Sequence, residues 1–136
     1  MLSQPKKTKF KKNKKNYLSH YIETKSNRLT KGLIGLKALE STRLTSRQIE
    51  SVRQSMNRNL NRKGKIWLHM FPHISVTEKP TENRMGKGKG SVAYWFTPIK
   101  VGTIFLEIGG VSFLKAKQAL LKGAKKLPIK TKIMIR

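Results

Sequence analysis

The feature that most constrains this chain is its charge, because 31 lysines and arginines stand against six acidic residues, all of them glutamate. The formal net charge is +25 over 136 residues. So much charge of one sign repels itself in a compact fold, which favours a folded state bound to a polyanion. Nucleic acid and an anionic membrane surface are the two candidates, and the sequence has no run of eighteen apolar residues that could span a bilayer. We therefore predict a nucleic-acid partner and no membrane partner.

The residue types needed for catalysis are scarce. Cysteine is absent, which excludes disulfides, thiolate zinc sites and cysteine nucleophiles. The six glutamates are scattered, and His69 and His73 lie on either side of a proline, so neither a carboxylate pair nor a metal site is expected. We expect a protein that is not an enzyme and that has no catalytic residues, metal or cofactor.

The first 31 residues differ from the rest of the chain. Residues 6–15 hold seven lysines and no acid, a composition too polar to form a core, and Tyr17, Leu18 and Tyr21 are among the few apolar anchors that follow. Hydrophobic residues still make up 37% of the whole chain, enough for one modest core. We expect a basic N-terminal extension over 1–31 and a single α+β RNA-binding domain over 32–136. No apolar leader is seen, so we expect the protein to work where it is made.

A helix is expected after Thr45, because Thr45 and Gln48 have the spacing of a capping box. The apolar stripe at helical spacing consists of Ile49, Val52, Met56 and Leu60. Gly64 is expected to end this helix. The cations that lie mostly off the stripe, and are expected to face RNA, are Arg47, Arg58, Arg62 and Lys63.

The remaining elements are expected to be strands and one further helix. Strands are predicted near 33–39, 65–71 and 129–135, and a β-hairpin over 92–108 with its turn at Val101-Gly102. A second helix is expected after Ser112, with an apolar face made of Phe113, Leu114, Leu120, Leu121, Ala124 and Leu127. This order predicts an α+β sandwich, in which two helices pack on a mostly antiparallel sheet.

A glycine-rich basic segment lies inside the polar stretch 77–91. Its residues are Arg84, Met85, Gly86, Lys87, Gly88, Lys89 and Gly90. Glycine lets backbone approach another surface closely, and the lysines and the arginine can neutralise phosphates or stack on a base. The spacing fits neither a Walker loop nor a dinucleotide fingerprint. From spacing alone, a finger inserted into RNA and an ordinary flexible basic loop are equally favoured.

Two further groups of residues have a possible RNA-binding role. The aromatic side chains Trp67, Tyr94, Trp95 and Phe96 are more typical of core packing than of base stacking. The basic arm contains a lone aromatic residue that can wedge into folded RNA. Its candidate RNA-binding residues are Lys6, Lys7, Lys9, Phe10, Lys11 and Lys12, joined in the domain by Arg43.

Several blocks of sequence, in order, resemble the bacterial-type large-subunit ribosomal protein L-sixteen family. They are Pro5–Lys12, Gly35–Ala38, Arg43–Glu50, Gly64–Trp67, Phe71-Pro72, Thr77–Pro80, Arg84–Gly90, Tyr94-Trp95 and Lys126–Thr131. The resemblance covers nearly the whole chain. It breaks down over 13–33, where family members carry a Gly- and Arg-rich stretch, so RNA contacts of that stretch cannot be carried over.

This resemblance implies an α/β hammerhead-like sandwich in the central crevice of the large subunit. The partners implied are large-subunit ribosomal RNA, aminoacyl-site tRNA and neighbouring ribosomal proteins. The arm would thread along ribosomal RNA, and the loop 84–90 would reach toward the tRNA and the peptidyl transferase region. Family members help to accommodate that tRNA and support late subunit assembly.

The compartment and the rival functions follow from composition. Abundant Lys, Asn and Ile indicate an AT-rich genome, which favours an organelle-encoded protein of a mitochondrial ribosome over a plastid or bacterial-cytoplasmic one. The alternative functions are a free-standing RNA-binding factor, a nuclease-like enzyme and a membrane-surface protein. A ribosomal protein should co-migrate with large subunits through a salt wash, and a protein with one of these other functions should not.

Overall fold

The computed structural model describes residues 4–14 and 21–136, so the expectations for Lys15, Tyr17 and Leu18 lie outside the described residues. The elements follow in the order β1 (Ile34–Ala38), β2 (Thr42–Thr45), α1 (Ser46–Asn59), β3 (Lys65–Leu68), β4 (Ile74–Glu78), β5 (Ser91–Ile99), β6 (Ile104–Gly109), α2 (Phe113–Ala124) and β7 (Thr131–Ile135). Two helices and antiparallel strands confirm the α+β class. Among the described residues, neither helix has the length and apolar character needed to cross a bilayer.

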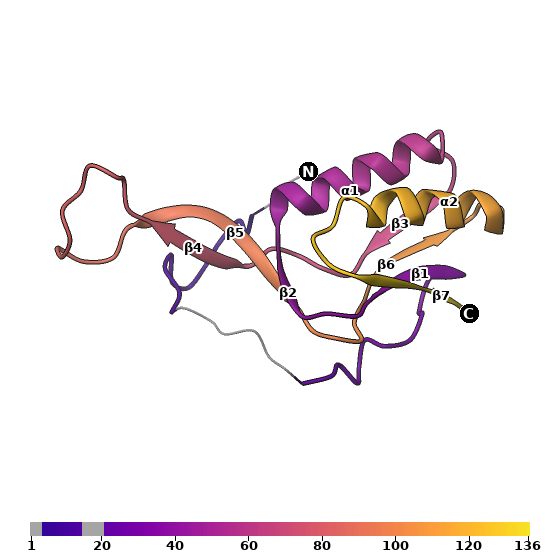
Figure 1. Ribbon diagram of the computed structural model, residues 1–136, viewed down its shortest axis with the longest axis horizontal. Coiled ribbons are helices and arrows are strands. Elements are labelled where there is room, and N and C mark those ends of the chain that lie inside the picture. The colour runs from indigo at the N-terminus through magenta and orange to yellow at the C-terminus, as the bar shows by residue number, and fades with distance from the viewer. Residues whose placement is uncertain (1–3, 15–20) are drawn as a thin grey trace.

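The strands form two antiparallel sheets. The larger sheet has the order β3-β6-β1-β7, and the smaller one has the order β2-β5-β4. In the larger sheet Leu36 is aligned with Leu106 on one side and with Ile133 on the other. Figure 1 shows both helices over one face of this sheet, while β4 and β5 project from it as a long hairpin. The body and the hairpin are thus distinct parts of the molecule.

Helix α1 begins as its sequence predicts. The Thr45 hydroxyl accepts a hydrogen bond from the Gln48 N–H, and the Gln48 side chain accepts one from the Thr45 N–H. The expected apolar stripe is fully buried, since Ile49, Val52, Met56 and Leu60 all belong to the core. The helix ends at Asn59, with Leu60 as its C-cap residue, before the predicted stop.

Gly64 does not end α1, contrary to the prediction. The turn after the helix is made by Asn61 and Arg62, which both have positive φ. Gly64 instead lies against β6, where an added Cβ would come 2.9 Å from the Gly109 carbonyl oxygen. Its small size allows the chain to enter β3 next to β6.

The predicted apolar face of α2 is wrong in part. The residues buried on this helix are Ala116, Ala119, Leu120 and Gly123, whereas Phe113, Leu114 and Leu121 are exposed. A Cβ on Gly123 would lie 2.7 Å from Met56 Cγ, so the two helices approach closely at this point. Small side chains form the contact because larger ones would separate the helices.

The predicted hairpin over 92–108 is also wrong. Strand β5 pairs with β2 and β4, whereas β6 pairs with β1 and β3 in the other sheet. The expected turn exists, but its residues bond to the end of β1. The Gly102 N–H donates to the Ala38 carbonyl, and the Ala38 N–H donates to the Thr103 carbonyl. Strands β2 and β4 were not predicted. The true hairpin joins β4 to β5 through the glycine-rich loop.

Candidate nucleic-acid interface

The glycine-rich loop lies at the tip of the projecting β4–β5 hairpin (Figure 1). Arg84, Lys87 and Lys89 are exposed, and the Met85 side chain is 97% exposed. The backbone turns through three consecutive residues with positive φ, which are Gly86, Lys87 and Gly88. Apart from their neighbours in the loop, none of the described residues lies within 4 Å of the Cβ positions of Gly86 and Gly88. The described part of the chain therefore gives these two glycines no packing partner.

A hydrogen bond shapes the loop from within, since the Lys79 ammonium donates to the Gly86 carbonyl. The loop encloses a cavity of about 580 Å³, with Arg84, Lys87 and Lys89 among its lining residues and Glu82 as its carboxylate. At the base of the loop, a Cβ on Gly90 would lie 2.3 Å from the Glu78 carbonyl oxygen. Gly90 therefore allows the two strands to close the hairpin.

The basic arm lies along the same hairpin. The Ser75 hydroxyl on β4 donates a 2.9 Å hydrogen bond to the Lys11 carbonyl, and the Lys12 ammonium donates one of 2.8 Å to the Lys89 carbonyl. Lys6, Lys7 and Lys9 are exposed. Phe10 is 68% exposed, with the Lys9 ammonium 5.6 Å from the ring centroid. The structure therefore brings the arm and the end of the loop together.

The other predicted cations do not form one cluster. Arg47 is exposed in the first turn of α1, whose N-terminal end faces the hairpin side of the molecule (Figure 1). Arg58 is in the last turn, and Arg62 and Lys63 follow the helix. A helix of 14 residues is about 20 Å long, so these three cations are remote from the first turn. The candidate residues thus occupy two separate areas of the surface.

The aromatic side chains of β5 differ in burial. Phe96 is 3% exposed, whereas Tyr94 on the same strand is exposed. The Arg43 guanidinium lies 5.2 Å from the centroid of the Phe96 ring. Phe96 therefore packs in the interior beside Arg43, Trp95 is half-buried, and Tyr94 is exposed on the hairpin.

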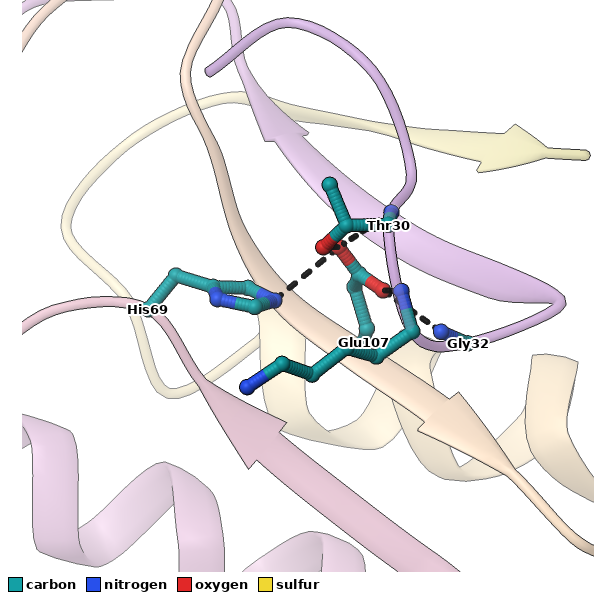
Figure 2. Close-up of polar contacts among 5 residues, drawn as sticks. Thr30, Gly32, His69 and Glu107 are labelled. Carbon is teal, nitrogen blue, oxygen red and sulfur yellow. Dashed lines mark hydrogen bonds and ion pairs between the residues drawn. The ribbon is translucent and has the colours of Figure 1, made fainter.

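Sequence reasoning missed a buried carboxylate that fastens the N-terminal extension to the domain. Glu107 on β6 is 1% exposed and lies between two segments, residues 30–32 and His69 (Figure 2). Its Oε2 accepts from the N–H groups of Lys31 at 2.7 Å and Gly32 at 2.6 Å, and its Oε1 accepts from the Thr30 N–H at 3.1 Å. His69 Nε2 lies 2.9 Å from Oε1. We call Glu107, His69 and residues 30–32 the Glu107 clamp.

Both oxygens of the Glu107 carboxylate have hydrogen-bonding partners in the clamp. Burial raises the pKa of Glu107, but hydrogen bonds from the N–H groups of Gly32, Lys31 and Thr30, together with the charge of His69, outweigh burial and lower that pKa below its ordinary value. Further backbone hydrogen bonds continue along the extension, from the Glu23 N–H to the Val101 carbonyl and from the Ile104 N–H to the Ser26 carbonyl. Residues 23–32 thus lie firmly on the body.

Other glutamates pair with neighbouring cations at the surface. Glu50 accepts two hydrogen bonds from Arg53, which lower its pKa to about 2. Glu23 lies 3.6 Å from the Lys100 ammonium, and Glu40 lies 3.6 Å from the Lys130 ammonium. Four of the six acids are therefore engaged on the body of the domain or on the segment that packs on it, away from the arm and the loop.

Comparison with known proteins adds independent information. Residues 5–134 match the model of a family described as ribosomal protein L16p/L10e. The chain is 49% identical over 134 residues to "Large ribosomal subunit protein uL16" of Cereibacter sphaeroides, which covers 98% of this chain and 96% of the relative. Proteins with the same description in Chelativorans sp. and Azorhizobium caulinodans are 49% and 47% identical over 133 residues, with the same coverage. These relatives are bacterial.

Proposed function

Because this chain belongs to the ribosomal protein L16p/L10e family, we propose that its basic surfaces bind large-subunit ribosomal RNA beside the aminoacyl-tRNA site. The family membership confirms the resemblance seen in the sequence and makes the chain a protein of the large ribosomal subunit. Its proposed tasks there are to help position the aminoacyl-site tRNA and to support late subunit assembly, next to neighbouring ribosomal proteins. Its contribution to translation is positional, with the chemistry left to the RNA.

The loop at the tip of the hairpin carries the tRNA part of this proposal. Arg84, Lys87 and Lys89 project from a backbone that has open space around Gly86 and Gly88. Cations on a narrow, glycine-rich backbone suit a gap between RNA elements, because the backbone adds little bulk and each cation neutralises a phosphate. Residues Arg84 to Gly90 are accordingly proposed to lie closest to the tRNA and the peptidyl transferase region.

The arm and the helix cations carry the ribosomal RNA part. The arm presents Lys6, Lys7, Lys9, Phe10, Lys11 and Lys12, and the domain presents Arg43, Arg47, Arg58, Arg62 and Lys63. These cations occupy separate areas on the body, the hairpin and the arm, so one straight duplex is a poor match. A cleft of folded RNA that surrounds the domain matches this distribution better, because each area can then meet its own phosphates.

The test is a triple variant, Arg84→Ala/Lys87→Ala/Lys89→Ala, placed in the ribosome that normally holds the chain. We expect the variant to keep its fold, since all three side chains are exposed, and to lower aminoacyl-site tRNA binding or the yield of mature large subunits by about tenfold, equivalent to about 1.4 kcal/mol. A matched control, Lys115→Ala/Lys117→Ala/Lys125→Ala, removes the same charge from exposed positions on α2 and its end. Normal subunit yield and normal elongation in the loop variant would contradict the loop's proposed role.

The ribosome in question is proposed to be that of a mitochondrion. The support is the composition, rich in Lys, Asn and Ile, which favours an AT-rich organellar genome. The bacterial relatives are equally consistent with a bacterial cytoplasm, so the test is to find which ribosomes contain the chain. Mass spectrometry of ribosomes from purified mitochondria of the source organism should detect the chain. Its detection in ribosomes of another compartment instead would reject this assignment.

A further inference from the structure

A second cavity lies between the β4–β5 hairpin and the first turn of α1, on the side of the molecule where these elements approach one another (Figure 1). Its volume is about 340 Å³, and none of residues 84–90 lines it. We call this cavity the Tyr94 pocket. Its lining residues come from the two strands and from the start of α1 with its cap, and they are Glu78, Ala93, Tyr94, Thr45, Ser46 and Arg47.

The Tyr94 ring and the Glu78 carboxylate project from the same face of the hairpin. Tyr94 is aligned with Val76 across the two strands, and Glu78 follows two residues after Val76 on β4. Residues two apart on a strand point to the same face, and so do the paired residues of neighbouring strands. Tyr94 is 38% exposed, and Glu78 is exposed as well. One side of the pocket therefore offers an aromatic ring and a carboxylate.

Arg47 supplies the positive charge of the pocket from the first turn of α1. Within the part of the chain that the structure describes, neither Arg47 nor Glu78 forms an ion pair. A carboxylate on a surface that binds RNA repels the phosphates that the cations attract. Glu78 is therefore best placed against a neutral group that donates hydrogen bonds.

A single unpaired nucleotide of RNA matches all three groups. Its base can stack on Tyr94, as unstacked bases do on aromatic side chains, and its phosphate can accept hydrogen bonds from the Arg47 guanidinium. An ionised carboxylate only accepts hydrogen bonds, so Glu78 selects a base edge that carries donors. Guanine has two adjacent donors on its Watson–Crick edge, N1–H and N2–H. Adenine and cytosine have one amino group there, and uracil has one N–H.

We propose that the Tyr94 pocket takes one unpaired guanosine of an RNA strand, with the base stacked on Tyr94, its N1–H and N2–H donating to Glu78, and a phosphate on Arg47. The volume is at the lower end of small-molecule sites, which suits one nucleoside better than a base pair. Phosphate contacts carry no sequence information, so this site adds base recognition to the basic surfaces. That the strand is ribosomal RNA rests on the proposed function, whereas guanine recognition rests on the pocket itself.

The test is the base preference of the full-length chain. Two twelve-nucleotide strands of uridines are compared by fluorescence anisotropy, one with a single central guanosine and one with a single central adenosine. Affinities are measured at moderate and high salt, because salt weakens phosphate contacts and largely spares a base contact. We expect wild type to bind the guanosine strand about fivefold more tightly, as one bidentate base contact allows. Equal affinities for the two strands would overturn the proposal.

Glu78→Gln separates base recognition from simple electrostatics. The variant keeps the shape of the side chain, removes its negative charge and replaces one acceptor oxygen with a donor. Loss of a repulsive charge alone should strengthen binding to both strands, whereas loss of guanine recognition should abolish the difference between them. The matched control, Glu82→Gln, makes the same change at an exposed glutamate outside the pocket and should keep the preference. An unchanged preference in Glu78→Gln would overturn the guanine assignment.

Substitutions of Tyr94 test the stacking. Tyr94→Leu should bind the guanosine strand about tenfold more weakly, and Tyr94→Phe, which keeps an aromatic ring, should bind like wild type. The melting temperatures should stay unchanged, because the side chain is exposed. In wild type, the NMR signals of the Tyr94 ring protons, identified by comparison with Tyr94→Phe, should shift when the guanosine strand binds. Signals that do not move on binding would overturn the pocket.

Guanosine monophosphate is the second probe, and it distinguishes the source of the nucleotide. A shift of the Tyr94 signals by guanosine monophosphate only at concentrations far above those of the strand supports a site for RNA. Equal shifts at equal concentrations overturn the RNA assignment and make the pocket a site for free guanine nucleotides. Failure of the pocket is distinct from failure of the proposed function. Wild type that joins large subunits without a base preference rejects only the pocket, whereas wild type absent from ribosomes rejects the function.

Discussion

Two junctions join the N-terminal extension to the domain, and their chemistry is opposite. At the Glu107 clamp, a buried carboxylate accepts hydrogen bonds from residues 30–32, and His69 Nε2 lies 2.9 Å from it (Figure 2). Where the arm meets the hairpin, the Lys12 ammonium donates to the Lys89 carbonyl and the Lys89 ammonium donates to the Asn13 carbonyl. The first junction is centred on a buried carboxylate. The second joins cations to neutral backbone oxygens in the part of the chain that the structure describes.

The difference shows how a chain with a net charge of +25 can fold and still bind RNA. Four of the six acids pair with cations or accept hydrogen bonds from backbone donors around the body. The remaining two, Glu78 and Glu82, are exposed near the hairpin tip. The excess positive charge is left to surfaces that a polyanion covers. Removal of an acid from the body and removal of a lysine from the arm should therefore have unlike consequences.

The largest effect is expected from Glu107→Gln. The variant keeps the shape of the side chain but places an amide among backbone N–H donors and leaves His69 without its partner. A hydrogen bond to a charged acceptor is worth about 1.5 to 3 kcal/mol, and the variant weakens three of them, so the free energy of unfolding in urea should fall by about 3 to 5 kcal/mol. The control, Glu50→Gln on α1, removes a half-buried pair at the surface and should cost about 1 kcal/mol or less. Equal losses in the two variants would reject the clamp.

Acid should remove part of the same stabilisation. The pKa of Glu107 is lower in the folded chain than its ordinary value of 4.5, so its contribution is fully present above pH about 4.5 and is lost as the pH falls through the folded pKa. Urea unfolding of wild type and Glu107→Gln between pH 7 and pH 3 should give stabilities that converge in acid. A constant difference across this range would show that ionisation of Glu107 contributes nothing.

A smaller loss of stability is expected from Gly32→Ala, and Gly88→Ala in the loop serves as the comparison. A Cβ at Gly32 would lie 2.7 Å from the Ile108 carbonyl oxygen and 2.9 Å from Glu107 Cβ, so β6 and the clamp must shift, at a cost of about 3 kcal/mol. Gly88 has open space around it, and its φ of +84° adds strain of about 1 kcal/mol. Melting temperatures of both variants test this order. RNA affinity should change only for Gly88→Ala, and a larger loss of stability at Gly88 would contradict the contrast.

The smallest effect on stability is expected from Ser75→Ala at the arm–hairpin junction. The variant removes the hydrogen bonds that join β4 to Lys11 and Asn13, at a cost of about 1 kcal/mol or less. Amide exchange of residues 11–14 should become faster, while the melting temperature stays within about 4 °C of wild type. Ser51→Ala, at an exposed position on α1, serves as the control and should leave arm exchange unchanged. A cooperative loss of the whole fold would mean that the arm is part of the core.

Features governed by neighbouring residues could be predicted from the sequence. The capping box at Thr45 and Gln48 and the stripe that includes Val52 and Met56 depend on spacing within one helix, so the sequence was sufficient for them. The exposure of Lys87 and Lys89 also followed from local chemistry, because charged residues between glycines have no core to join. Recognition of the family drew on ordered blocks over the whole chain and was confirmed.

Features that depend on distant pairing could not be predicted in the same way. The turn at Val101-Gly102 looks the same whether the flanking strands pair or diverge, and only the end of β1, at Ala38, directs β6 into the other sheet. The exposed positions of Phe113 and Leu121 follow from the close approach of Met56 to Gly123. The sequence pattern predicted burial from the hydrophobicity of the α2 residues. In the fold, the close contact between α1 and α2 buries the small residues instead.

By itself, the sequence determined that the chain is a basic α+β protein with a lysine arm and a glycine-rich loop, because charge, spacing and helix caps act over a few residues. Only the tertiary structure decided which cations meet. Lys14, Arg43 and Lys89 are brought to one cavity, and Glu107 is brought to Thr30, Lys31 and Gly32. These partners are tens of residues apart in the chain, and they become neighbours only when strand pairing and helix packing bring their segments together.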